Sequence, residues 1–289
     1  TSGVPQIAVH GSRLTQLSMR LAILGGGTIA RLCLEHIRRG DLGAIEVVAI
    51  AGRSAASRGK ALADEHGVAF VTDLSGLLAC RPETVVEAAS HDAVRDYCEP
   101  LLQNGVGVIV LSGGALCDDG LRMRLERAAE ESRAPLYVPS GGIGGLDALK
   151  AACIAGVESV RITVAKPPAA WKKIAYVDAL GIDLDALTSA RTLYEGAARG
   201  GVPLFPANVN IAAVLSMAGV GFDQTQLKVV ADPGITYNTH TIEVRGVTGN
   251  FSIRLENVPA PDNPKTAWLA CYSALAAMKL AGSAVRYGT

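Results

Sequence analysis

Short apolar runs alternate with segments of helical periodicity along the first half of the chain. The runs predict buried strands at residues 20–24, 46–51, 69–71, 84–88, 107–111 and 136–138. The segments between them predict helices at residues 29–39, 54–66, 74–80, from 91 onward, and 121–132. Strands that alternate with helices at this pitch are typical of a parallel sheet with helices on both faces. The fold class predicted for residues 19–139 is therefore α/β, a Rossmann-like doubly wound parallel sheet.

The pattern changes after Ser140. A loop with four glycines, residues 140–147, precedes an apolar helix predicted at residues 149–154. Segments of alternating polar and apolar positions then predict strands at residues 160–165, 241–245 and 251–256. We therefore expect residues 140–261 to form a second domain of the α+β class, with a mixed or antiparallel sheet. A role of this domain in catalysis and dimerisation is implied by the resemblance of its motifs to a known family.

The two ends of the chain lie outside these stretches. Residues 262–289 are expected to form a final helix that packs back on the first domain, with Asn263 as its N-cap and Pro264 at its first position. Residues 1–18 have neither the basic head nor the continuous apolar stretch of a signal peptide. Because Met19 directly precedes the first strand, we interpret part of this leader as an addition from cloning.

The glycine loop between the first strand and the first helix predicts a dinucleotide site. Gly25 allows a tight turn, Gly27 lets the backbone approach a pyrophosphate, and the small Ala30 lets helix and strand pack closely. The pyrophosphate would lie on free N–H groups at the start of the helix, which adds Thr28 and Ile29 to the expected cofactor contacts. The alternative is a glycine turn that only connects strand to helix.

The end of the second strand bears on the choice of cofactor. NAD sites commonly place an acidic residue there to hold the ribose hydroxyls, whereas here the strand ends in Gly52-Arg53-Ser54 without an acid. An arginine suits the 2′-phosphate of NADP, so Arg53 is a candidate contact, and NADP is expected to bind at least as well as NAD. The alternative is that Arg53 is a solvated loop residue.

Further cofactor contacts are expected after the strand at residues 84–88, at Ala89 and Ser90. The run Ser90-His91-Asp92 contains the residue types of a hydrolase triad, but adjacent residues cannot adopt that geometry. Ser90 is better interpreted as a helix cap.

Composition excludes several classes of partner. The 27 basic and 27 acidic residues cancel, so the net charge gives no reason to expect a nucleic acid or an anionic membrane. No apolar run reaches the length that crosses a bilayer. The six cysteines are far apart, without a C-x-x-C pair, which favours reduced thiols in a cytoplasmic protein over disulfides or a metal site.

Five stretches of the second half together resemble the L-aspartate dehydrogenase family. They are Ser140–Leu149, Lys166-Pro167-Pro168 with Trp171, Phe205–Ala213, Ala231-Asp232-Pro233 leading to Asn238-Thr239-His240, and Asp262–Thr266. The resemblance covers nearly the whole chain from Met19, in the same order and with similar spacing.

The resemblance implies an enzyme that oxidises L-aspartate to iminoaspartate with NAD or NADP, after which the imine hydrolyses to oxaloacetate and ammonia. It also implies a soluble homodimer, and some family members supply iminoaspartate to NAD synthesis. The family's active-site histidine falls on His240, and its cofactor contacts fall on Gly142 and Asn210.

Three positions depart from the family pattern. Gly142 stands where alanine is usual, and the first loop has a glycine, Gly26, at a position where the commoner form has another residue. Thr241 stands where glutamate often follows the histidine, and Glu243 is an acidic residue nearby in sequence.

The residues themselves also draw attention to His240. The substrate amine must be unprotonated, and a water must then add to the imine, steps that suit a general acid–base group such as histidine. Of the five histidines, only His240 lies in a polar run at the start of a predicted strand. The alternative is a structural histidine.

The two carboxylates of aspartate require charge-assisted donors. The candidates are Lys166, Lys172, Asn208, Asn238 and Thr239, each of which could equally be a solvated surface group. Asn210 lies in a polar notch before an apolar helix at residues 211–218, where its amide could meet the nicotinamide carboxamide. Alternatively, Asn210 caps that helix.

Two other functions stay open at this point. One is a two-domain dehydrogenase for another substrate, such as a homoserine or dihydrodipicolinate reductase-like enzyme, which shares the architecture but not the motifs around His240 and at residues 263–266. The other is a sensor that binds NAD or NADP without turnover.

Overall fold

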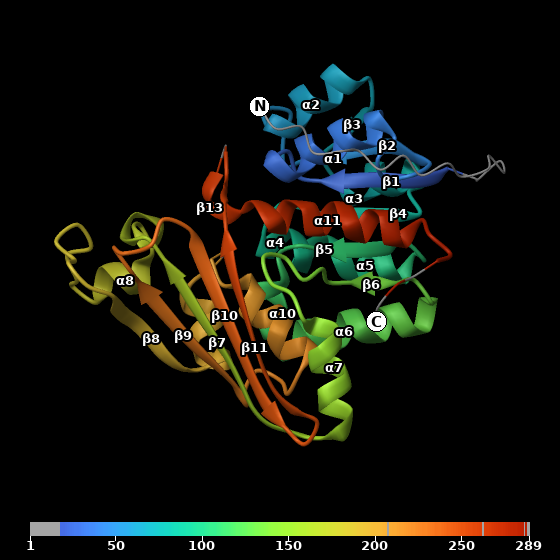
Figure 1. Ribbon diagram of the computed structural model, residues 1–289. Helices are drawn as coiled ribbons and strands as arrows, with labels where there is room; N and C mark the ends of the chain where they lie inside the picture. Colours follow the sequence, from blue (N-terminus) through green and yellow to red (C-terminus); the bar gives the residue numbers. More distant parts are fainter. Residues whose placement is uncertain (1–17, 207, 262, 286, 288–289) are drawn as a thin grey trace, which may run out of the picture.

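The computed structural model describes residues 18–206, 208–261, 263–285 and 287. The prediction for the leader, residues 1–18, falls outside the described residues except for Ser18. The described chain forms two large sheets, each with its own helices, which lie side by side (Figure 1), and a third sheet of two short strands.

The N-terminal part holds a six-stranded parallel sheet with the order β3-β2-β1-β4-β5-β6. Its strands are β1 (Met19–Leu24), β2 (Ile45–Ala51), β3 (Ala69–Val71), β4 (Thr84–Glu87), β5 (Gly107–Val110) and β6 (Leu136–Tyr137). All neighbouring strands pair in parallel. The predicted doubly wound sheet is confirmed, and each of its strands begins and ends within one residue of the predicted bounds.

Helices cover both faces of this sheet, and an apolar cluster is buried on each face. The helices are α1 (Thr28–Arg39), α2 (Arg58–His66), α3 (Leu74–Ala79), α4 (His91–Ala93), the π-helix η1 (Val94–Cys98), α5 (Glu99–Gln103), the 3-10 helix η2 (Gly113–Cys117) and α6 (Asp119–Ser132).

The first residues of α4 and α2 test two predictions made from the sequence. The Ser90 hydroxyl accepts a hydrogen bond from the Ala93 N–H at 3.2 Å, so the prediction that Ser90 caps a helix is confirmed. The prediction that a helix begins at residue 54 was wrong, because α2 begins at Arg58. A turn precedes it, in which the Ser57 N–H donates to the Ser54 carbonyl at 3.0 Å.

The second part holds a five-stranded mixed sheet with the order β11-β10-β7-β9-β8. Its strands are β7 (Val157–Lys166), β8 (Arg191–Ala197), β9 (Thr225–Ala231), β10 (Asn238–Gly246) and β11 (Gly249–Asn257). Only the pair β7 and β9 is parallel among these neighbours, so the predicted mixed sheet is confirmed.

Helices of the second part surround a third apolar cluster. They are α7 (Leu146–Ala155), η3 (Pro168–Trp171), α8 (Ala175–Ala179), α9 (Ala198–Gly201), η4 (Val202–Leu204) and α10 (Asn210–Ala218). α10 lies between the mixed sheet and the N-terminal part (Figure 1). Its first residues therefore come close to the parallel sheet.

The chain returns to the N-terminal part for its last helix, α11 (Trp268–Ala281), which packs on α1 and on the apolar cluster of the parallel sheet. The prediction that this helix begins at Asn263 was wrong. Residues 263–267 instead form β13 (Asn263–Ala267), which pairs with β12 (Pro259–Ala260). The local capping pattern is overridden by this pairing.

Two crossings therefore connect the parts, one through the loop after β6 and one through β13. They lie side by side, because a Cβ placed on Gly142 would be 3.1 Å from the Cβ of Ala267. An ion-pair network also joins the parts. Arg199 of α9 pairs with Asp119 of α6 at 2.9 Å and with Asp223 at 2.8 Å.

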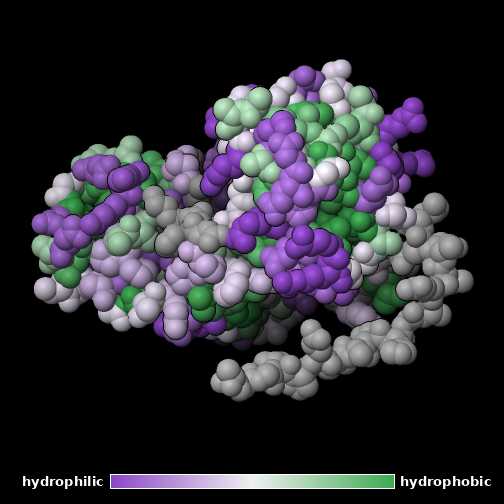
Figure 2. All heavy atoms as spheres, turned by 90° about the horizontal axis from the view of Figure 1, so that it is seen from above, coloured by the Kyte–Doolittle hydropathy of each residue, from purple (hydrophilic) through white to green (hydrophobic). Residues whose placement is uncertain are grey.

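Seen from above, the surface carries interspersed hydrophilic and hydrophobic side chains on both parts (Figure 2). No helix in the described ranges combines the length and the apolar content needed to span a membrane.

The glycine loop after β1 packs directly against the start of α2. A Cβ on Gly26 would lie 2.2 Å from the backbone nitrogen of Gly59 and 2.5 Å from its Cα. A Cβ on the neighbouring Gly27 would meet no atom within 4 Å. The unusual second glycine of this loop is therefore required by packing, and the open space beside Gly27 remains for a ligand.

We expect Gly26→Ala to lower the free energy of unfolding by roughly 2 kcal/mol or more, because both groups in the clash are backbone and cannot rotate away. Urea unfolding of the two variants measures this. Gly27→Ala is the matched control and should stay within about 0.5 kcal/mol of the parent chain. Equal losses in both variants would contradict the packing described for Gly26.

Candidate active site

A cavity of about 390 Å³ lies where the carboxyl ends of the parallel strands face the second sheet. Its walls come from the loops after β1, β4, β5 and β6, the start of α10, and the ends of β7 and β10 that lie at this edge. Doubly wound sheets bind their ligands at this edge. Another cavity, of about 520 Å³ between α6, α7 and α10, is lined by none of the predicted site residues.

Most of the predicted site residues line the first cavity. They are Gly27, Thr28, Ile29, Ala89, Gly142, Lys166, Asn208, Asn210, Asn238 and His240. A neighbouring cavity of about 340 Å³ is lined by Gly25, Arg53 and Ser90 and shares Gly27 and Ala89 with the first. The fold thus gathers at one place residues that are far apart in sequence.

His240 is buried on β10, where its ring is held by the loop after β6. Its Nδ1 lies 3.0 Å from the Gly142 carbonyl oxygen. The Asn257 side-chain nitrogen lies 3.1 Å from the same Nδ1. We assign the proton to Nδ1, because a carbonyl oxygen only accepts and the other tautomer would place two lone pairs against each other at 3.0 Å. The Asn257 side-chain amide donates to the same oxygen at 3.0 Å. The Nε2 atom of His240 is consequently a lone-pair acceptor, and it is buried without a partner among the described residues.

Burial lowers the pKa of His240 to about 4, against the opposing effect of the Gly142 carbonyl, and the positive charge of Lys166 lowers it further. The imidazole is therefore neutral at pH 7 and can act as a base. The unfolded chain takes up this proton near pH 6.5, before the folded chain does. The contribution of His240 to stability is thus complete above pH 6.5 and is lost as the pH falls toward 4.

Neither Thr241 nor the acidic Glu243, the two neighbours considered from sequence, supports His240. Successive residues of a strand face opposite sides, so Thr241 and Glu243 lie on the other face of β10 from His240. Asn257, at the end of β11, takes the supporting place instead. Sequence reasoning missed it, because only the pairing of β10 with β11 brings it beside the histidine.

Lys166 is a buried cation at the end of β7 and is 3% exposed. Its ammonium donates to the backbone carbonyl of Asn208 at 3.1 Å and to the side-chain oxygen of Asn208 at 3.3 Å. It also lies 5.1 Å from the centre of the Trp171 ring. The Asn208 amide nitrogen donates to the Pro206 carbonyl. Asn208 therefore orients Lys166, and Lys166 brings the positive charge to the cavity.

The remaining residues considered as ligands of the substrate carboxylates differ in whether they line the cavity. The Asn238 side-chain nitrogen is buried without a partner in the described chain, and this residue lines the cavity. Thr239 faces away from it, and its hydroxyl donates to the Tyr237 carbonyl. Lys172 pairs with Asp185 at 2.6 Å. The structure thus corrects two expectations, since neither Thr239 nor Lys172 lines the cavity.

Asn210 joins the two parts of the molecule. Its side-chain oxygen accepts the Gly114 N–H at 3.1 Å, which fixes the orientation of the amide because a backbone nitrogen only donates. His91 Nε2 donates to the same oxygen at 3.2 Å. The amide nitrogen of Asn210 remains available to the cavity. The alternative of a helix cap is excluded, because the N-cap residue of α10 is Val209.

Glu87 is a buried carboxylate that sequence reasoning missed. It lies at the end of β4 and accepts four hydrogen bonds, from the N–H groups of Ala89, Ser90 and Ser112 and from the Ser112 hydroxyl. Burial raises the pKa of Glu87, while these donors oppose the shift. An acid that ends an otherwise apolar strand was the available signal. It ties together the loops after β4 and β5 that line the cavity.

The glycine loop fits the pyrophosphate of a dinucleotide. Gly25 has a φ of +123°, and a Cβ there would lie 2.6 Å from the Ala88 carbonyl oxygen, so only glycine is accommodated. The open space beside Gly27 lets a phosphate approach the N–H groups at the start of α1. Within the described residues, no group of three His, Cys, Asp or Glu side chains could hold a metal ion.

Comparison with known proteins agrees with this geometry. A family model described as "Homoserine dehydrogenase, NAD binding domain" matches residues 25–139, and one described as "Aspartate dehydrogenase, C-terminal" matches residues 147–281. L-aspartate dehydrogenase 2 of Bordetella pertussis is 41% identical over 265 residues, which cover 91% of this chain and 97% of that protein. The chain belongs to the L-aspartate dehydrogenase family.

Other members of this family give the same result. L-aspartate dehydrogenase of Methanosarcina barkeri is 45% identical over 71% of this chain and 76% of its own length. The crystal structure of aspartate dehydrogenase from Thermotoga maritima is 29% identical, with a TM-score of 0.73, and covers 93% of this chain and 99% of its own.

A more distant solved structure shares the fold alone. GenD2 from gentamicin biosynthesis, solved with NAD, is 16% identical at a TM-score of 0.56.

The family confirms the resemblance inferred from the five motifs. The homoserine dehydrogenase description covers the nucleotide domain alone, whereas the second part matches aspartate dehydrogenases. A homoserine dehydrogenase-like activity therefore has no support from the second part of the chain, which carries His240.

We expect Glu87→Gln to destabilise the protein by roughly 1–3 kcal/mol, because the amide nitrogen that replaces one oxygen then faces an N–H or O–H donor. Glu130→Gln, at an exposed position on α6, is the matched control. Thermal unfolding of both variants measures the difference. A Glu87→Gln variant as stable as its control would show that these hydrogen bonds contribute nothing.

Proposed function

We propose that this chain catalyses the NAD(P)-dependent oxidation of L-aspartate to iminoaspartate, which hydrolyses to oxaloacetate and ammonia, and the reverse reductive amination. The observation that carries the proposal is the buried, unpartnered Nε2 of His240 in a cavity that also holds the Lys166 ammonium. Its relatives are named L-aspartate dehydrogenases.

The cofactor site uses groups of the N-terminal part and one group of the second part. The glycine loop and the start of α1, at Gly27, Thr28 and Ile29, would hold the pyrophosphate. The free amide hydrogen of Asn210 would donate to the carboxamide oxygen of the nicotinamide. A bound dinucleotide would supply the acceptor for the hydride of the substrate Cα. NAD and NADP are both proposed as cofactors.

The substrate site lies against the second sheet. The positive charge of Lys166 and the free amide hydrogen of Asn238 bind the substrate carboxylates and orient the Cα–H. His240 Nε2 takes a proton from the substrate ammonium and releases it to solvent, so that it is again free when hydride loss from Cα has left the imine. It then takes a proton from the water that attacks the imine carbon and gives that proton to the departing amine. Its Nδ1–H stays on the Gly142 carbonyl throughout, so the ring keeps its orientation.

An assay of nicotinamide absorbance tests this proposal. With oxaloacetate and ammonium, NADPH or NADH should be consumed, and pyruvate or 2-oxoglutarate should give little reaction. Loss of absorbance must depend on ammonium if the reaction is a reductive amination. Binding of NADP without turnover of any keto acid would overturn the proposal and favour a sensor.

We expect His240→Ala to lower kcat by about a hundredfold or more, the usual size of an acid–base contribution, with dinucleotide affinity nearly unchanged. His66→Ala, on a helix of the N-terminal part, is the control and should keep its activity. Protonation of His240 should lower kcat/KM at acidic pH, and the midpoint of this fall should lie near pH 4 instead of 6.5, because burial lowers the pKa of His240. Unchanged turnover in His240→Ala would remove this residue from the mechanism.

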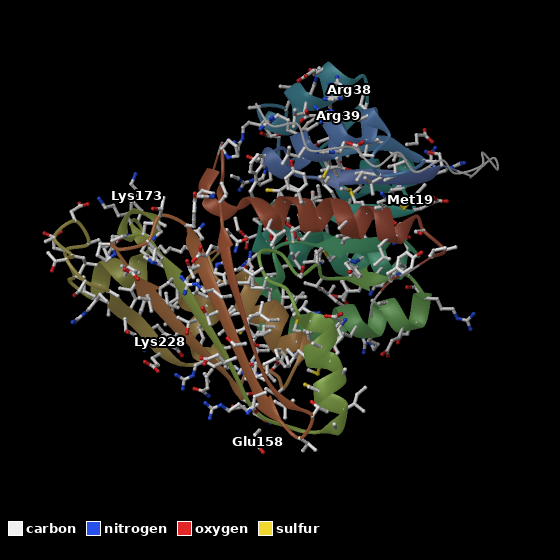
Figure 3. The ribbon with its side chains drawn as sticks, viewed as in Figure 1. Met19, Arg38, Arg39, Glu158, Lys173 and Lys228 are labelled. Atoms are coloured by element: carbon white, nitrogen blue, oxygen red, sulfur yellow. The ribbon has the colours of Figure 1, made fainter. Side chains whose placement is uncertain are left out.

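The homodimer and the cytoplasmic location also remain proposals. Charged side chains on the outer face of the second sheet support self-association, among them Lys228, which pairs with Glu195 at 3.1 Å (Figure 3). Arg161 pairs with Glu195 at 3.7 Å on the same face. Such alternating charges suit a face that meets its own copy. Sedimentation velocity should give twice the mass of one chain, and a single-chain mass would contradict the dimer.

A further inference from the structure

His91 lies beside the cofactor site and has no part in the proposed reaction. It is the first residue of α4, in the segment that follows β4. Its neighbours Ser90 and Asp92 line the cavity of about 340 Å³, whereas His91 is not among the described residues that line this cavity or the active-site cavity. Its partly buried imidazole reaches the second part instead, with 3.2 Å between Nε2 and the Asn210 side-chain oxygen. His91 therefore contacts a wall residue of the active-site cavity from outside that cavity.

The hydrogen on the His91 imidazole follows from the other partner of Asn210. The Gly114 N–H donates to the same Asn210 oxygen at 3.1 Å, which identifies this atom as the amide acceptor. A ring nitrogen at 3.2 Å from an acceptor must carry a hydrogen, so we assign one to Nε2 of His91. Two donors of the N-terminal part thus converge on one oxygen of the second part. The amide nitrogen of Asn210 is thereby left for the cavity that this residue lines.

The glycine at residue 114 makes room for this junction. A Cβ there would lie 2.4 Å from the Asn210 side-chain oxygen and 2.9 Å from the His91 Nε2. A side chain at this position would therefore enter between the imidazole and the amide and separate them.

One buried carboxylate holds the segments that carry both donors. Glu87 accepts the N–H groups of the two residues directly before His91, at 2.8 and 3.0 Å. It also accepts the N–H and the hydroxyl of Ser112, two residues before Gly114, at 2.9 and 3.0 Å. The position of His91 relative to Gly114 is consequently set within the N-terminal part, which then offers both donors to α10.

Other contacts already join the two parts of the molecule. The start of the second part packs on the first through α10 and η2, and Arg199 pairs with Asp119 across the same boundary. The bond from His91 differs from these contacts, because it ends on a polar atom of a residue that lines the active-site cavity. Its effect therefore falls on the direction of the Asn210 amide.

We propose that His91 is a positioning residue for the nicotinamide end of the cofactor. Together with the Gly114 N–H, it holds the oxygen of the Asn210 amide away from the cavity, so that the amide hydrogens face the carboxamide oxygen of the nicotinamide. This inference rests on the proposed function, which puts the nicotinamide against Asn210. When the His91 donor is lost, the amide is held by Gly114 alone, and a rotated amide would turn its oxygen toward the carboxamide oxygen.

Binding to the cofactor-free protein tests this role without any turnover. Isothermal titration compares NADH with ADP-ribose, and NADPH with 2′-phospho-ADP-ribose, because the members of each pair differ in the nicotinamide alone. His91→Leu keeps the approximate size of the side chain but has no donor. It should weaken NADH and NADPH by about three- to tenfold, the size of one lost hydrogen bond, and leave the affinity for the two nicotinamide-free probes unchanged.

Three further variants separate positioning from a structural effect. His91→Gln places an amide nitrogen close to the position of Nε2 and should restore most of the NADH affinity. In an Asn210→Ala background, His91→Leu should cause no further loss, because its effect passes through Asn210. His36→Leu is the matched control, since His36 also belongs to the N-terminal part but bonds to Asp41 at 2.7 Å outside both cavities. It should change no affinity.

The outcomes distinguish this inference from the proposed function. If His91→Leu weakens NADH and ADP-ribose equally, weakens neither, or adds its full effect to that of Asn210→Ala, His91 does not position the nicotinamide, and the dinucleotide site stays in place. If the parent chain binds neither the reduced cofactors nor their nicotinamide-free probes, the proposed function itself is overturned.

Discussion

The close approach of α10 to the loop after β5 is the constraint on which the site depends. A side chain at Gly114 would displace Asn210, because a Cβ there would lie 2.4 Å from the Asn210 side-chain oxygen. The hydrogen bond from the Gly114 N–H to that oxygen holds the start of α10 against the carboxyl edge of the parallel sheet. Burial keeps His240 neutral and strengthens the effect of the Lys166 charge, since both side chains are almost completely removed from solvent.

Local pattern was sufficient for the strands of the parallel sheet and for the glycine loop, because apolar runs and glycine spacing carry that information in a few adjacent residues. In the second sheet it predicted β7, β10 and β11 but not β8 or β9. It failed at residues 263–267, where a good helix cap is present but the partner strand β12 decides the structure. It also failed at residue 54, since the turn before α2 forms hydrogen bonds that no local propensity indicates.

The residues of the candidate site were likewise predicted only in part. His240 and Asn210 lie in the cavity where the motifs put them, whereas Lys172 finds its ion-pair partner outside it. Asn257 and Glu87 were missed for a common reason. Each contacts a backbone group that is distant in sequence, the Gly142 carbonyl for Asn257 and the Ser112 N–H for Glu87, and no local pattern indicates such a contact.

The two crossings of the chain between the sheets bear on the orientation of His240. Because Gly142 and Ala267 lie side by side, both crossings pass the same point, and both residues line the cavity. The imidazole of His240 is bonded to the carbonyl of Gly142, so the covalent connection between the two parts also fixes the direction of the candidate base.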